Sequence, residues 1–199
     1  ASRLAHAQGI RLAEELLRRH LQDQGNWPRG LVIDLWGSAT MRTAGEEFAM
    51  ALHLAGLAPV WDDGSDRVTG VEAVPLAMLR RPRIDVTLRV SGLFRDVFPT
   101  LPQVFETGAA LLAGRDEDPA DNPYRARAPR VFGPAPGQYG LGMGQAIEDY
   151  SDAGRAAAGE AWLAASSWAI DARGESRPDR TGLEERVRAA AAFAHAQDR

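Results

Sequence analysis

The chain has 199 residues, of which 45% are hydrophobic, so it can bury the core of one domain, with or without a helical appendage. Its 27 acidic and 23 basic residues give a net charge of −4, which disfavours nucleic acids and anionic membrane surfaces as partners. The absence of cysteine excludes disulfides, thiolate nucleophiles, iron–sulfur clusters and cysteine-ligated zinc.

The first third of the chain alternates between helical and strand patterns. Leucines about four residues apart predict an amphipathic helix over residues 3–22, with basic residues in its last turn. A strand over residues 31–36 leads into a helix that ends at Gly56, for which Thr43 and Glu46 have the spacing of a capping box. Further along, turn residues Asp-Asp-Gly-Ser separate two short predicted strands, over 58–61 and 67–74.

The remaining elements follow the same logic. Residues 84–90 alternate between apolar and polar side chains, which predicts a strand covered on one face only. A helical pattern from Leu93 to Leu112 should break or kink at Pro99 and Pro102. Four final segments are predicted, namely a long surface loop over 114–137, a Gly-rich turn, and helices over 153–170 and 180–197.

This order of elements predicts an α/β fold. We expect a twisted, mostly parallel sheet of about four to five strands flanked by helices, with a helical C-terminal section. Residues 1–127 would form the strand-loop-helix units, and residues 128–199 a Gly-rich loop with the helical section. No apolar run approaches the roughly 20 residues of a membrane-spanning helix, and no signal peptide opens the chain, so a cytoplasmic location is expected.

Four sequence blocks carry a resemblance to a known family. They are LVIDLWGSATMRTAGEE at 31–47, RIDVTLRVSGLFRDVFP at 83–99, RVFGPAPGQYGLGMG at 130–144 and ERVRAAAAFAHAQD at 185–198. In this order they resemble the large subunit of aerobic cobaltochelatase, a relative of the magnesium chelatase H subunit. The resemblance spans nearly the whole chain and implies an internal piece of a subunit several times longer.

The resemblance also implies a reaction. The family's large subunit binds a tetrapyrrole, hydrogenobyrinic acid a,c-diamide, and inserts Co²⁺ as the substrate metal for cobalamin biosynthesis. ATP is hydrolysed by separate AAA+ partner subunits. The composition agrees with such a division of labour, because the chain contains no Lys and a Walker A loop requires one.

Candidate substrate-binding residues follow the ends of predicted strands, where ligands dock on open α/β sheets. Arginine recognises carboxylates through two parallel hydrogen bonds, and the implied substrate carries several carboxylates around an apolar ring. Trp36 would offer a flat face to that ring, and Tyr139 would cap it from the Gly-rich stretch. The predicted substrate-binding residues are Trp36, Ser38, Arg42, Arg89, Ser91, Arg95 and Tyr139. An exposed Arg or a core Trp is the structural alternative at these positions.

Metal insertion needs a base, because ring N–H hydrogen must leave as a proton. Asp34, within an otherwise apolar strand, and Glu47 are the candidate catalytic residues. If the two strands are neighbours, Arg89 is the obvious partner for Asp34, and a purely structural ion pair is the competing interpretation. The four histidines lack the spacing of a metal site, so the metal ligands stay unknown.

Three alternatives remain open at this point. The first is a magnesium chelatase H-type subunit with a porphyrin substrate. The second is a non-catalytic interaction module, in which the Ala-rich segment 153–197 docks another domain or an AAA+ partner. The third is a free-standing nucleotide-sugar-binding α/β protein, which a thermal shift with nucleotides would reveal.

Overall fold

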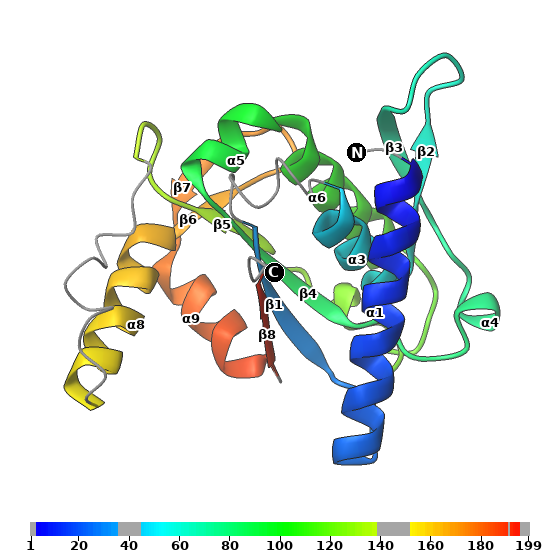
Figure 1. The fold of residues 1–199 in the computed structure, drawn as a ribbon, viewed down its shortest axis with the longest axis horizontal. Coiled ribbons are helices and arrows are strands. Elements are labelled where there is room, and N and C mark those ends of the chain that lie inside the picture. Colours follow the sequence, from blue (N-terminus) through cyan, green and yellow to red (C-terminus); the bar gives the residue numbers. More distant parts are fainter. Residues whose placement is uncertain (1–2, 36–44, 139–151, 191, 196–199) are drawn as a thin grey trace.

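A computed structural model describes residues 3–35, 45–138, 152–190 and 192–195. Its main sheet has six strands in the order β7-β6-β5-β4-β1-β8, and a separate hairpin pairs β2 with β3 (Figure 1). The strands are β1 (Gly30–Leu35), β2 (Leu57–Trp61), β3 (Val68–Ala73), β4 (Asp85–Val90), β5 (Val131–Gly133), β6 (Trp168–Ile170), β7 (Ser176–Pro178) and β8 (Ala192–His195). The helices are α1 (Arg3–Gln24), α3 (Glu46–Ala55), α4 (Leu76–Leu79), α5 (Gly92–Val97), α6 (Thr100–Ala113), the 3₁₀ turn η1 (Pro123–Arg125), α8 (Asp152–Ser166) and α9 (Arg180–Ala189).

The predicted α/β class with a mostly parallel sheet is confirmed. Strand β1 pairs in parallel with β4 and β8, and β4 pairs in parallel with β5, whereas β6 and β7 are antiparallel additions. The sheet has one strand more than the upper expectation, because short strands between and after the last two helices join it. Strands on both sides of residue 127 therefore share one sheet.

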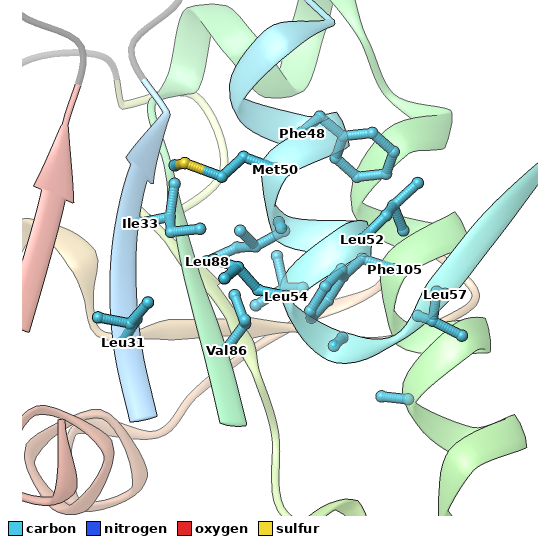
Figure 2. Close-up of a cluster of buried hydrophobic side chains, with 14 of the residues drawn as sticks. Leu31, Ile33, Phe48, Met50, Leu52, Leu54, Leu57, Val86, Leu88 and Phe105 are labelled. Atoms are coloured by element: carbon cyan, nitrogen blue, oxygen red, sulfur yellow. The ribbon is translucent and has the colours of Figure 1, made fainter. Parts of the chain in front are cut away.

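Two helical layers cover the sheet on opposite faces. Alternate residues of β1 and β4 point into the main hydrophobic core, where they meet α3 and α6 (Figure 2). The labelled contributors are Leu31, Ile33, Phe48, Met50, Leu52, Leu54, Leu57, Val86, Leu88 and Phe105. A second cluster of Phe132, Ala169 and Leu183 packs against Trp162 and Leu163 of α8. Helices α8 and α9 thus lie across the sheet from α1 and α3 (Figure 1).

Buried arginines close the carboxyl end of α3. Arg81 donates to the carbonyl oxygens of His53 and Leu54, at 2.7 and 3.0 Å. Arg83 donates to the carbonyl oxygen of Gly56 at 2.9 Å and forms a bidentate pair with Glu117. These contacts satisfy carbonyls that a helix end leaves without intrahelical partners. They also connect α3 to the chain that enters β4.

Several local expectations need correction. The alternating strand β4 is buried on both faces, because α8 and α9 cover its polar side, where Arg89 bonds to Ser166 and Thr87 bonds to Arg186. The segment 114–137 is not only a surface loop, since it contains η1, with the fully buried Tyr124, and β5. Helix α3 begins at Glu46 after Gly45, so Glu46 opens the helix instead of closing a capping box, and Thr43 lies outside the described residues.

The C-terminal section also differs from the helical prediction. Helix α8 ends at Ser166 and β6 follows, while α9 ends at Ala189 and β8 follows. Strands of three or four residues are too short to show a period of two in an Ala-rich sequence, so the helical pattern hid them. By contrast, the predicted break at Pro99 is confirmed. It separates α5 from α6, and Pro102 is accommodated in the first turn of α6.

Candidate functional site

The carboxyl ends of β1, β4 and β5 lie side by side at one edge of the sheet, because these three neighbouring strands are parallel. Most of the predicted site residues lie at or just after these strand ends. Trp36, Ser38 and Arg42 follow β1 in the sequence, and Tyr139 follows β5, but all four lie outside the described residues. Asp34, Glu47, Arg89, Ser91 and Arg95 are described.

Asp34 and Arg89 form the predicted pair. They are register partners on β1 and β4, and Arg89 Nη1 lies 3.4 Å from Asp34 Oδ1. Both side chains point to the α8 face of the sheet, since their neighbours Ile33 and Leu88 point into the main core. Asp34 is 6% exposed and Arg89 1% exposed. Charges buried this deeply need mutual pairing and further hydrogen bonds to be tolerated.

Helix α8 supplies those further hydrogen bonds. Trp162 Nε1 donates to Asp34 Oδ2 at 3.1 Å, and Arg89 Nε donates to the Ser166 hydroxyl at 2.9 Å. Both oxygens of Asp34 therefore face donors, an arrangement that suits an ionised carboxylate. Sequence reasoning missed Trp162 and Ser166. No local pattern pointed to them, because Trp162 is 128 positions from Asp34 and packing alone brings them together.

Glu47 occupies the first turn of α3, and the residue is 8% exposed. Among the described residues, its buried Oε2 has no hydrogen-bond partner. Burial raises the pKa of the Glu47 carboxyl to about 7, and the negative charges of Asp34 and Glu46 act in the same direction. A carboxyl group with this pKa can both accept and release a proton near neutral pH, which is the behaviour required of a general base.

Ser91 and Arg95 organise the end of β4. The Ser91 hydroxyl accepts a hydrogen bond from the Phe94 backbone N–H at 3.0 Å and so caps α5. Arg95 Nη1 donates to the carbonyl oxygen of Pro134 at 2.8 Å, just after β5. Arg95 therefore joins the segments that follow two adjacent strands. Its side chain keeps 16% exposure, and its Nε lies 3.7 Å from Asp96 Oδ1.

The described residues also contain a cavity away from this site, and they lack both a metal-binding group and a membrane-spanning helix. A cavity of about 350 Å³ opens at the opposite, amino-terminal edge of β5, among residues that include Glu106, Tyr124 and Arg130. None of the five described site residues lines it. Within the described ranges, no three His, Asp or Glu side chains gather as a metal-binding group. No helix in the described part of the chain is long and apolar enough to cross a membrane.

Known proteins resemble this chain over 80% or more of its length. The aerobic cobaltochelatase subunit CobN of a Sinorhizobium species is 40% identical over 98% of the chain, and that of Pseudomonas aeruginosa is 40% identical over 96%. The chain spans 17% of the length of each of these relatives. The magnesium-chelatase subunit ChlH of Oryza sativa subsp. japonica is 32% identical over 80% of the chain, which spans 13% of that protein.

The fold has a solved counterpart as well. The catalytic subunit of cobaltochelatase from Mycobacterium tuberculosis superposes on the whole chain with a TM-score of 0.89 and 37% sequence identity, and the chain covers 18% of that structure. The family model for CobN/magnesium chelatase matches residues 2–199. This match, together with the CobN relatives and the shared fold, shows that the chain belongs to the CobN/magnesium chelatase family of metal chelatases.

Proposed function

We propose that this chain is a segment of the large, tetrapyrrole-binding subunit of an ATP-dependent cobaltochelatase. In this proposal the whole subunit inserts cobalt(II) into hydrogenobyrinic acid a,c-diamide in cobalamin biosynthesis. The observation that carries the choice of cobalt is the 40% identity with CobN over 98% of the chain, against 32% over 80% for the magnesium-chelatase subunit. A magnesium-type reaction on a porphyrin is the competing outcome.

The ATP-hydrolysing step belongs, in this proposal, to AAA+ partner subunits. The chain contains no Lys, which a Walker A loop needs for the β- and γ-phosphates.

The substrate cleft on which these partners would act has a wall that includes the carboxyl edge of the sheet. Arg95 supports this assignment, because its side chain lies just past the ends of β4 and β5 and keeps 16% exposure. Trp36, Ser38, Arg42, Ser91 and Tyr139 are proposed to complete the wall.

The chemistry proposed for this edge is proton removal from the ring. As cobalt(II) bonds to the ring nitrogens, the macrocycle must release its inner N–H hydrogen as a proton. The Glu47 carboxylate takes this proton and passes it to water, and its pKa of about 7 supports this role. Asp34 stays charged between Arg89 and Trp162. Its fixed negative charge favours protonation of Glu47 and stabilises the incoming cation.

The role proposed for Arg89 differs from the substrate binding that the sequence predicted. Its guanidinium is buried against Asp34 and Ser166, which supports a role in holding Asp34 more than direct contact with the substrate. Substrate binding by Arg89 stays a prediction. The carboxylates of the tetrapyrrole would instead meet Arg42 and Arg95.

The test uses the full-length subunit with its AAA+ partners, ATP and substrate, and compares cobalt with magnesium. Glu47→Gln should lower kcat for cobalt insertion by about 10²- to 10⁴-fold, because it removes the base. The substrate Kd, followed by ring absorbance, should not change. Glu46→Gln is the matched control, since it removes a neighbouring carboxylate, and it should retain most activity.

Three results would count against the proposal. Equal kcat for Glu47→Gln and the control would remove Glu47 as the base. Magnesium insertion into a porphyrin without cobalt insertion would establish the magnesium-type reaction. Binding of the AAA+ chain to this segment, with cobalt insertion intact after deletion of residues 36–42, would favour a non-catalytic interaction module.

A further inference from the structure

One face of α8 contacts both members of the buried ion pair. Trp162 bonds to Asp34 at 3.1 Å and Ser166 bonds to Arg89 at 2.9 Å. The two α8 residues are four positions apart, so they lie above one another on the same side of the helix. The register of β1 and β4 places Asp34 and Arg89 directly beside each other. A single docking position of α8 therefore satisfies both contacts.

Apolar packing determines that docking position independently of the polar contacts. Trp162 and Leu163 pack against Phe132 of β5 and Leu183 of α9. The indole ring of Trp162 thus packs against the hydrophobic cluster, while its N–H donates a hydrogen bond to Asp34. Since an indole N–H only donates, it bonds to Asp34 through an acceptor oxygen and holds that oxygen in one direction.

We propose that Trp162 and Ser166 are positioning residues for metal insertion, and that α8 orients the Asp34 carboxylate and the Arg89 guanidinium toward the reaction edge. This inference rests on the proposed function. Trp162 anchors Oδ2 of Asp34, Arg89 anchors Oδ1, and Ser166 anchors the other side of Arg89. Loss of one anchor lets the carboxylate rotate, which misplaces its charge relative to Glu47 and the incoming metal.

The test is Trp162→Phe in the full-length subunit, assayed with the AAA+ partners, ATP, cobalt and hydrogenobyrinic acid a,c-diamide. The substitution keeps an aromatic ring in the cluster and removes the N–H donor. Removal of such a supporting hydrogen bond should lower kcat by about 10-fold with KM unchanged. The matched control is Trp168→Phe in β6, a strand residue whose indole takes no part in the described contacts of Asp34.

A merely structural role would lower the unfolding temperature or the yield and leave kcat per folded molecule near the control. That result for Trp162→Phe would overturn the proposal. Ser166→Ala supplies a second, smaller variant, and it should lower kcat in the same direction with KM unchanged.

A double variant separates this inference from the proposed function. In an Asp34→Asn background, Trp162→Phe should lower kcat no further, because the charge that it positions is already gone. An independent, multiplicative loss would overturn the positioning role. If Asp34→Asn alone leaves kcat at the wild-type value, then the role of Asp34 in the proposed function fails, and this inference fails with it.

Discussion

Glu47 is a carboxyl group held in the protein interior with one oxygen that no described residue bonds. Its ordinary pKa is 4.5, and burial raises this value to about 7. The folded chain therefore binds the proton more tightly than the unfolded chain does. Between these two pH values the folded state holds more protons, so stability falls as the pH rises. A residue whose shifted pKa lowers stability in this way is typical of a catalytic or binding site.

This linkage gives a prediction for the free energy of unfolding. Glu47→Gln cannot ionise, so the stability of the variant relative to wild type should rise by about 3 kcal/mol between pH 4 and pH 8. Urea unfolding of both proteins across this range measures the difference, and groups that do not interact with Glu47 cancel in the subtraction. A difference that does not change with pH would show that Glu47 titrates normally.

Helices α1 and α3 approach each other more closely than ordinary side chains allow. The contact is at Gly9, where an added Cβ would lie 2.3 Å from the Glu46 carbonyl oxygen and 2.6 Å from Ala49 Cβ. Real Cβ atoms do not come so close to backbone. The glycine lets α1 lie against the amino end of α3, the helix that begins with Glu46 and Glu47 (Figure 1).

Gly9→Ala should therefore destabilise the protein by about 1 to 3 kcal/mol, even though Ala is the better helix former. Gly159→Ala in α8 is the matched control. Apart from the backbone of α8 itself and the two neighbouring residues, no described atom lies within 4 Å of the Cβ position at Gly159, so helix propensity should dominate there and stabilise by up to about 1 kcal/mol. Thermal unfolding of the two variants should shift in opposite directions, and a stabilising Gly9→Ala would contradict the close approach.

At the scale of the whole molecule, a charged network joins the C-terminal part to the central strands. Arg130 Nε donates to Asp85 Oδ1 at 2.9 Å, and Arg186 Nη1 donates to Asp85 Oδ2 at 2.8 Å. Arg186 also donates to the Thr87 hydroxyl at 2.8 Å. Burial alone would raise the pKa of Asp85, but the hydrogen bonds and charges of Arg186 and Arg130 outweigh it and hold the pKa below its ordinary value. The network therefore loses its contribution as the pH falls through that lowered pKa.

Removal of the shared carboxylate should loosen α9 and the strands that accompany it. Asp85→Asn leaves the buried guanidinium of Arg130 without its anion and removes the anion of Arg186, so the free energy of unfolding should fall by about 3 to 5 kcal/mol. Arg188→Ala breaks a surface pair with Glu184, in which the Arg188 side chain is 77% exposed. It should change stability by less than about 0.5 kcal/mol. Chemical unfolding measures both, and equal effects would show that the network contributes nothing.

Local patterns in the sequence were sufficient to predict the strands and helices that form the edge of the site. The alternation in 84–90, the apolar strand after residue 30, the hairpin turn and Pro99 each act within a few residues, and the structure confirms those elements. Asp34 and Arg89 were paired correctly because strand neighbours with opposite charges in apolar surroundings must meet. The family could also be identified from four short blocks of residues.

Only the tertiary structure decided which groups surround that pair. Strands β5 to β8 are three or four residues long, so their existence depends on the sheet that they join and not on their own periodicity. Trp162 and Ser166 reach the ion pair from a helix far along the chain, and the proton affinity of Glu47 depends on burial by distant segments. Periodicity and turn chemistry act over a few neighbouring residues, whereas burial and long-range contacts exist only once the chain has packed.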